Sequence, residues 1–116
     1  EPKNALARIN LGAAYLRKGL LDQAIDQQRQ AISLAPRNAM ARANLGAAYG
    51  QKGMLDEAIG ELKQALLLDP QYAKAHYNLA VAYHLKDDRK LAEYHFGRAV
   101  QLGHPSASDP SKRNQP

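Results

Sequence analysis

The sequence has no cysteine and no tryptophan, and it has only one phenylalanine. The absence of cysteine excludes disulfides, thiolate catalysis and zinc–thiolate sites, and it is compatible with either a reducing or an oxidising compartment. Because large aromatic side chains are scarce and alanine is abundant, we expect a core in which helices approach each other closely through small side chains.

The sequence also lacks long apolar runs. None approaches the roughly 20 residues that a helix needs to cross a bilayer, and no signal peptide is recognisable, so no membrane partner is expected and the localisation stays unknown. The chain begins at Glu1 rather than methionine, which suggests an excised or processed piece. The formal net charge of +5 includes Lys112 and Arg113 near the C-terminus, so charge alone argues weakly for a nucleic-acid partner.

A period of 34 residues runs through the chain and indicates a repeat architecture. Prolines, asparagines, leucines, tyrosines and alanines all recur in this register. The recurring sets are Pro2, Pro36 and Pro70; Asn10, Asn44 and Asn78; Leu11, Leu45 and Leu79; Tyr15, Tyr49 and Tyr83; Ala24, Ala58 and Ala92; and Ala31, Ala65 and Ala99.

Each period predicts two amphipathic helices, which in the first period cover about residues 5–18 and 21–34. The residues between them agree, because glycine suits the left-handed residue that ends a helix, asparagine caps a helix start, and proline stops a helix. These residues are Gly19 and Gly53, Asn38, and Pro36 and Pro70.

The segments LGAAY (11–15), LGAAY (45–49) and LAVAY (79–83), with the periodic alanines and prolines that follow them, resemble the tetratricopeptide repeat signature. The resemblance implies an all-α fold: an α-solenoid of three helix-turn-helix repeats that form a right-handed superhelix with a concave groove. It predicts an array over residues 1–103, with repeats at about 5–38, 39–72 and 73–104. A disordered C-terminal tail is expected over 104–116.

Small and large positions of the repeat have packing roles. We expect Gly12 and Gly46 to let the two helices of one repeat touch, with the alanines at 24, 58 and 92 at the facing small site. The sequence also departs from the family where an aromatic residue is usual. Those positions carry Arg8, Arg42 and His76 in the first helices and Gln28 and Leu62 in the second helices, and only Phe96 keeps the aromatic.

The two ends of the array differ. The leucines and isoleucines that begin the second helix of repeats one and two are Leu21, Leu55, Ile25 and Ile59. In the third repeat they are replaced by Arg89 and Glu93, which predicts a polar terminal face and a natural end of the array. The first helix shows no such change, and residues 1–4 resemble the close of a preceding repeat, so we expect the C-terminal part of a longer array.

In the family that the sequence resembles, the residue before each signature leucine faces the groove. The resemblance therefore assigns Asn10, Asn44 and Asn78 to peptide binding. A side-chain amide both donates and accepts, so an asparagine row can bond to the backbone of an extended peptide. The alternative is that these asparagines support the fold. Helical spacing adds further residues to the same face: Leu6, Ile9, Ala13 and Arg17; Met40, Ala43, Ala47 and Gln51; and Lys74, Tyr77, Val81 and His84.

A specialised subclass of the family clamps a C-terminal carboxylate with several lysines, arginines and asparagines. Asn44 and Lys74 match that pattern, whereas Ile9 and Ala13 stand where a lysine and an asparagine are needed, and Asn78 stands where an arginine is needed. The complete clamp is therefore not expected. Arg17 and Lys74 remain candidates for contact with acidic groups of a partner.

The sequence gives little support for metal or cofactor binding or for catalysis. His76 and His84 are eight residues apart, and they would approach His95 only if their helices converge, so neither a metal site nor any other cofactor is expected. There is no glycine-rich phosphate loop and no nucleophile elbow, and outside the tail the only serine is Ser33. We expect no enzyme activity.

The sequence thus predicts a protein- or peptide-binding scaffold or adaptor that holds a partner polypeptide in the concave groove. The alternative is a self-association module that forms a homo-oligomer through the uncapped N-terminal face. RNA binding is less favoured, because the basic residues are spread among the helices and do not form a stripe. A role as the repeat arm of a larger enzyme also stays open, as do the partner and the pathway.

Overall fold

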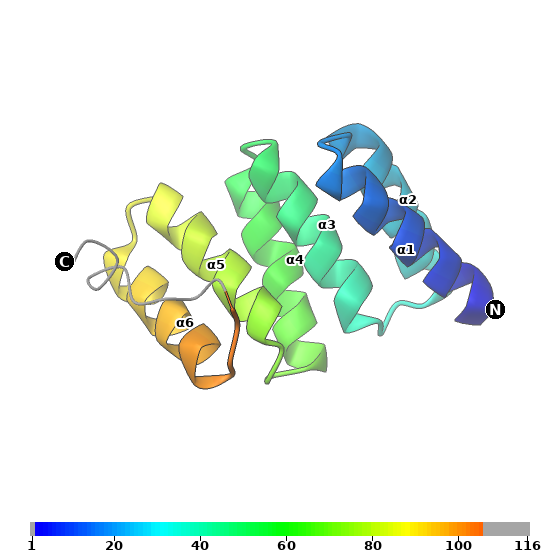
Figure 1. The fold of residues 1–116 in the computed structure, drawn as a ribbon. Coiled ribbons are helices and arrows are strands. Elements are labelled where there is room, and N and C mark those ends of the chain that lie inside the picture. Colours follow the sequence, from blue (N-terminus) through cyan, green and yellow to red (C-terminus); the bar gives the residue numbers. More distant parts are fainter. Residues whose placement is uncertain (1, 106–116) are drawn as a thin grey trace.

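The computed structural model describes residues 2–105, with side chains from residue 4 onward. These residues form six α-helices and no strand: α1 (Pro2–Arg17), α2 (Leu21–Leu34), α3 (Ala39–Gln51), α4 (Leu55–Leu68), α5 (Ala73–Leu85) and α6 (Arg89–Gln101). Successive hairpins stack side by side from the N-terminal to the C-terminal end (Figure 1). The predicted α-solenoid of three helical hairpins is confirmed. No helix within this part of the chain is both long enough and apolar enough to cross a membrane.

The curvature of the array follows from which helices touch. Within residues 2–105, α1 contacts α3 and α3 contacts α5, whereas α2 and α4 do not contact each other, nor do α4 and α6. The odd-numbered helices therefore lie closer together than the even-numbered helices. They form the inner face of the array, and α2, α4 and α6 form its outer face.

The turns within the repeats confirm the sequence prediction. Gly19 and Gly53 have φ angles of 77° and 81°, a left-handed conformation that glycine adopts without steric cost. Asp87 occupies the same position of the third repeat with a φ of 62°, and aspartate is one of the few other residues that tolerate this region. Asn38 caps α3 as predicted, because its Oδ1 accepts a hydrogen bond of 3.0 Å from the backbone N–H of Ala41.

Two glycines of the repeat signature set the distance between paired helices. A Cβ at Gly12 would lie 2.4 Å from Gln28 Nε2, and a Cβ at Gly46 would lie 2.6 Å from Leu62 Cγ. The close approach is as predicted, but the side chains that fill the space are Gln28 and Leu62. The alanines at the predicted facing site play a smaller part, with the backbone oxygen of Ala58 third nearest to Gly46.

The core is rich in alanine, as the composition predicts. Its largest cluster joins the second and third repeats, where Leu62, Leu79 and Tyr83 pack with four buried alanines. Ile9, Leu62, Leu79 and Gln28 are the largest side chains with less than 2% exposure. Small side chains therefore set the spacing of the helices, and a few aliphatic side chains fill the remaining space.

The described chain starts in a helix and ends in a turn, and that turn departs from the predicted tail. Pro2 lies at the start of α1, where a helix needs no backbone donor. His104, the first residue of the predicted tail, is held in place: its backbone N–H donates to the Ala99 oxygen at 3.0 Å, and its ring lies 4.6 Å from that of Tyr77. Residues 106–116 of the predicted tail lie outside the described residues.

Candidate peptide-binding groove

The three asparagines of the predicted row have different environments. Asn10 on α1 is exposed, Asn44 on α3 is only 2% exposed, and Asn78 on α5 is partly buried. The repeat register places them at equivalent positions, but the neighbouring repeats cover them to different extents. The row therefore consists of three distinct sites.

Asn44 is tied to the next repeat by a lysine. Lys74 Nζ donates a hydrogen bond of 3.0 Å to Asn44 Oδ1. Burial lowers the pKa of Lys74, and the positive charge of Arg17 lowers it further. The pair holds a partly desolvated ammonium group at a fixed position on the inner face.

Asn78 has an unused donor. Its Nδ2 is buried and has no hydrogen-bond partner among the described residues. Asn78 also lines a cavity of about 300 Å³ between α3, α4 and α5, which we call the α3–α5 slot. The slot is lined by Gly46, Ala47, Gly50 and Gln51 of α3, by Leu55, Ala58 and Leu62 of α4, and by Tyr77, Asn78, Val81, Ala82 and Leu85 of α5. A buried donor thus lies beside an apolar space.

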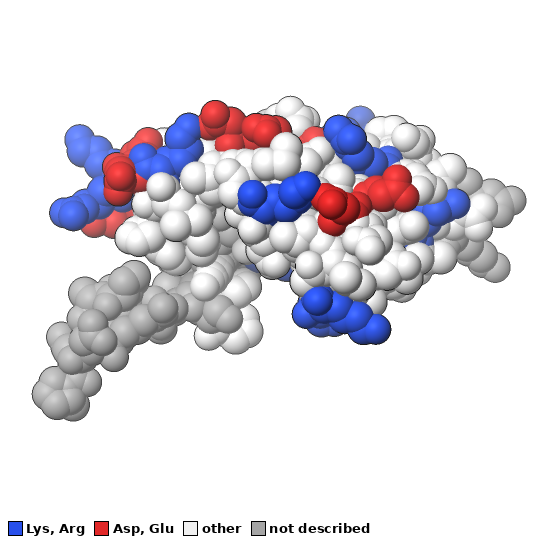
Figure 2. Space-filling model, turned by 90° about the horizontal axis from the view of Figure 1, so that it is seen from above, with Lys and Arg blue, Asp and Glu red and all other residues white. Residues whose placement is uncertain are grey.

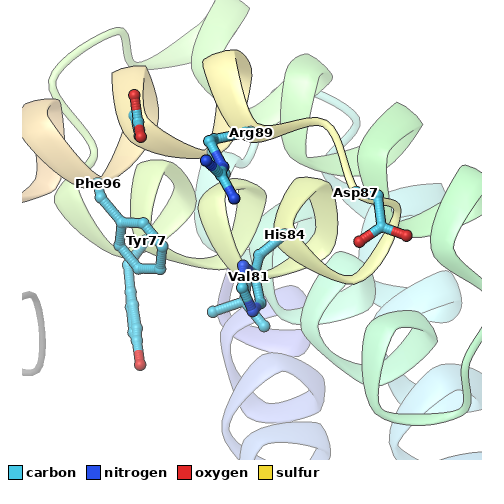
Figure 3. A pocket seen from close by; sticks show the side chains of 8 residues that line it. Tyr77, Val81, His84, Asp87, Arg89 and Phe96 are labelled. Carbon is cyan, nitrogen blue, oxygen red and sulfur yellow. The ribbon is translucent and has the colours of Figure 1, made fainter. Parts of the chain in front are cut away.

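A larger cavity, of about 780 Å³, lies one repeat further along, between α5 and α6 (Figure 3). It is lined by Tyr77, Val81, His84, Asp87, Arg89, Ala92, Glu93 and Phe96. Tyr77 and Phe96 lie at one end and Asp87 lies at the other, with Val81, His84 and Arg89 between them. Within the described chain no further helix closes this cavity, and its walls include the charged replacements that predicted a terminal face.

The other predicted groove residues divide into accessible and buried groups. Leu6 and Met40 are 53% and 46% exposed, and Val81 is 37% exposed. Arg17, Gln51 and His84 are also exposed, while Ala13, Ala47, Lys74 and Tyr77 are partly exposed. Two residues do not lie where the helical projection placed them. Ile9, 1% exposed, packs against Ala31 and Ala41, and Ala43, 0% exposed, belongs to the main core cluster. Each points into the contact between neighbouring helices, so neither side chain is available to a partner.

A contact that the sequence did not predict recurs in each hairpin. Arg8 donates to Gln27 Oε1 at 3.2 Å, Arg42 Nη1 lies 3.2 Å from Glu61 Oε2, and His76 Nδ1 lies 3.0 Å from His95 Nδ1. The first-helix residues of these contacts recur at intervals of 34, and so do the second-helix residues. The first-helix residues are the three that replace the usual aromatic. That replacement, together with the matching polar residue on the second helix, was the available signal.

The histidine pair has an assignable hydrogen-bond pattern. His76 Nε2 lies 3.0 Å from the Pro70 carbonyl oxygen, which can only accept, so Nε2 carries the proton. With a single proton on the His76 ring, at Nε2, its Nδ1 is the acceptor and His95 Nδ1–H is the donor. Burial lowers the pKa of His95 to about 4, assisted by His76 and Lys63. Over residues 4–105 no three metal-ligating side chains come together.

Comparison with known proteins agrees with the repeat architecture. A TPR repeat model matches residues 51–87, and a tetratricopeptide repeat model matches residues 5–38. Among curated protein sequences none matches this chain significantly.

Solved structures of similar fold include the second TPR of Spaghetti (RPAP3) bound to the HSP90 peptide SRMEEVD, with a TM-score of 0.82 and 26% identity over 87% of this chain and 94% of that chain. The Sgt2 TPR domain from Aspergillus fumigatus has a TM-score of 0.82 and 28% identity, covering 90% of this chain and 70% of that chain. A MamA variant has a TM-score of 0.75 and 31% identity, covering 85% of this chain and 72% of that chain. With its three helical hairpins and these matches, the chain belongs to the tetratricopeptide repeat family.

Proposed function

We propose that this protein is a binding scaffold that holds an extended segment of a partner polypeptide against α1, α3 and α5. The observation that carries the proposal is the buried, unpartnered Nδ2 of Asn78 at the wall of the α3–α5 slot. A buried donor without an acceptor costs free energy, and rotation of the amide toward the slot would let a peptide carbonyl oxygen accept from it. The peptide held by the second TPR of Spaghetti supports the same kind of partner.

The apolar walls of the slot supply the second part of the interaction. Ala47 and Gly50 leave room that larger side chains would fill, and Val81 and Leu85 offer exposed aliphatic surface. A partner side chain that enters this space would be removed from water while its backbone bonds to Asn78. The exposed amide of Asn10 offers a further backbone contact at the other end of the groove.

Selection of peptides from a random phage-displayed library on the full chain, followed by calorimetry, tests the proposal. We expect Asn78→Ala to weaken binding of the selected peptides by about tenfold, the usual cost of losing a buried hydrogen bond. The matched control is Gln64→Ala, which truncates an exposed amide on α4. Unfolding of both variants in urea separates this role from a structural one. If Asn78→Ala lowered stability and left affinity unchanged, or if no peptide were selected, the proposal would be wrong.

A second candidate function is self-association through the exposed apolar surface of α1, where Leu6 and Leu11 are 53% and 43% exposed. Stacking of the α1 end of one copy on the α6 end of another is disfavoured. Between neighbouring repeats, Lys52 and Lys86 pair with Asp22 and Asp56 of the preceding repeat. In the third repeat the position equivalent to these aspartates is occupied by Lys90. It would face Lys18 of the second copy. The candidate therefore requires α1-to-α1 contact, and light scattering that shows a monomer at all concentrations would exclude it.

A further inference from the structure

The cavity between α5 and α6 has no role in the proposed peptide binding. Its volume is about 780 Å³, and it opens at the C-terminal end of the array (Figure 3). Cavities of roughly 300–1,000 Å³ are the usual size of small-molecule sites. We call this space the α5–α6 cavity, and the nature of its walls indicates what it can hold.

The α5–α6 cavity is the third-repeat counterpart of the α3–α5 slot. In the slot, small and aliphatic side chains of α3 and α4 allow α5 to pack closely over them. In the cavity, larger or charged side chains occupy the equivalent positions, which disfavours the close approach of another helix. A smaller ligand fits these walls better. The equivalent pairs are Ala47 and Val81, Gly50 and His84, Leu55 and Arg89, and Leu62 and Phe96.

The cavity has an aromatic end and a charged end. Tyr77 and Phe96 form the aromatic end, where their ring centroids are 5.9 Å apart. Val81 follows along the floor of the cavity, and His84 and Arg89 lie beyond it. The Arg89 side chain is directed from α6 toward His84 and Val81 (Figure 3). A ligand in this space would therefore contact apolar surface with one part and a guanidinium group with another.

The charged side chains of the cavity have no partners of opposite sign. Within residues 4–105, Arg89, Asp87 and Glu93 make no ion pair and no side-chain hydrogen bond. By contrast, Lys52 and Lys86 each pair with an aspartate of the preceding repeat. In Figure 2, basic and acidic side chains are intermixed at the left of the view, which is the α6 end of the array. Both signs of charge are therefore available to a ligand here.

Charges of both signs in one cavity favour a ligand that also carries both. A ligand with only a carboxylate would bind Arg89 but would also lie near two acids, Asp87 and Glu93. A ligand with only an ammonium group would bind the acids but would lie near Arg89. A zwitterion can form a charge-assisted contact with each sign and leaves no like charges facing each other.

We propose that the α5–α6 cavity binds a free α-amino acid with an aromatic side chain. Arg89 binds its carboxylate, Glu93 binds its ammonium group with support from Asp87, and its ring lies over Val81 beside Phe96. Arg89 and Phe96 are seven residues apart on α6, which is about 10 Å along the helix. The long Arg89 side chain covers part of that distance, and the amino acid covers the rest.

Phenylalanine and three analogues test this proposal by nuclear magnetic resonance titration of the isotope-labelled full chain. Phenylalaninamide keeps the ammonium group and lacks the carboxylate, N-acetylphenylalanine keeps the carboxylate and lacks the ammonium group, and alanine lacks the ring. We expect phenylalanine to bind about tenfold more tightly than either single-charge analogue, as for the loss of one charge-assisted contact. We expect no measurable binding of alanine, and chemical-shift changes concentrated in α5 and α6.

Substitutions assign the two charged contacts. Arg89→Gln should lower the affinity for phenylalanine to that for phenylalaninamide, and Glu93→Gln should lower it to that for N-acetylphenylalanine. Lys90→Gln and Glu57→Gln, which remove exposed charges outside the cavity, are the matched controls and should leave the affinity unchanged. Circular dichroism shows whether each variant is folded. Arg89→Lys keeps the test informative if Arg89→Gln does not fold, because it should retain part of the preference for the carboxylate.

Several outcomes would overturn the inference. Equal affinity for phenylalanine and both analogues, or a preference for the carboxylate that survives Arg89→Gln, would show that the paired charges do not bind the ligand. Shifts centred outside α5 and α6 would place the ligand elsewhere, and an absence of binding would mean that these charges are only solvated. Each of these results leaves the peptide groove untouched, because the random peptide library tests that function separately.

Discussion

At the scale of single residues, the two kinds of helical glycine in this chain have different physical roles. A Cβ at Gly46 would lie 2.6 Å from Leu62 Cγ and 3.1 Å from the Ala58 backbone oxygen, so the glycine is required for the approach of α3 and α4. Gly60, in the middle of α4, faces open space, and a Cβ there would have no neighbour within 4 Å. The periodic glycine is a packing requirement, and Gly60 is not.

Substitution by alanine should therefore have opposite effects at these two positions. We expect Gly46→Ala to reduce the free energy of unfolding by about 1–3 kcal/mol, because buried Leu62 must move to admit the methyl group. Gly60→Ala should increase it by up to about 1 kcal/mol, because alanine favours the helix. Urea unfolding followed by circular dichroism measures both. A stabilising Gly46→Ala would contradict the close packing described here.

At the scale of helical elements, each hairpin has a side-chain contact between polar residues in the same register. The first two contacts use arginine with glutamine or glutamate, whereas the third joins α5 and α6 through His76 and His95. The His95 ring also stacks on Tyr83 at 5.7 Å and meets the edge of Tyr94 at 5.0 Å. Among the described residues, only the third hairpin therefore uses a contact between two imidazole rings at this position.

Acidification should weaken the α5–α6 hairpin specifically. The fold lowers the pKa of His95 from 6.5 to about 4 by burial, with further contributions from His76 and Lys63. Because the fold favours the neutral ring, the stabilisation is complete above the unfolded pKa and is lost as pH falls from 6.5 toward 4. We expect a loss of about 1 kcal/mol, well below the full value of the shift, because solvent screens a half-exposed group.

Urea unfolding across this pH range measures the effect. His95→Gln should remove most of the dependence while keeping a hydrogen-bonding side chain, as Gln27 does in the first hairpin. His84→Gln, at an exposed position of α5, is the matched control and should retain it. An unchanged pH dependence in His95→Gln would show that other groups cause the loss.

At the scale of the whole molecule, the array is 48 Å long and 25 Å wide, and its repeats contact only their immediate neighbours. The largest core cluster lies between the second and third repeats, and separate smaller clusters join the first to the second. In such an array stability is close to a sum over repeats and their interfaces. A substitution that weakens one interface between repeats should therefore destabilise mainly the helices next to that interface.

Leu79→Ala tests this expectation. Leu79 is 0% exposed in the largest cluster, so its truncation should cost about 2–5 kcal/mol through lost burial and a residual cavity. Hydrogen exchange should lose protection in α5 and α6 more than in α1 and α2. Leu67→Ala, at a position 75% exposed, should change stability by less than about 0.5 kcal/mol. Uniform loss of protection along the array would indicate that the repeats unfold as one unit.

The sequence alone determined the repeat period, the helices and their turns. These features depend on interactions between residues close in the chain. Examples are the left-handed turns at Gly19 and Gly53 and the helix cap at Asn38. Because the sequence repeats, equivalent positions can be compared in up to three copies. The polar replacements Arg89 and Glu93 could likewise be recognised against their equivalents in the earlier repeats. The groove residues that remain accessible are still predictions of function.

Only the tertiary structure decided which side chains of the inner helices are available. Ile9 and Asn44 were both expected to face a partner, yet Ile9 is in the core and Asn44 is covered and bonded to Lys74. The same holds for the contact of His76 with His95 and for Asn78 Nδ2, which has no partner among the described residues. These outcomes depend on the rotation of each helix about its axis and on the curvature of the array, which the side chains of all three repeats determine together by packing.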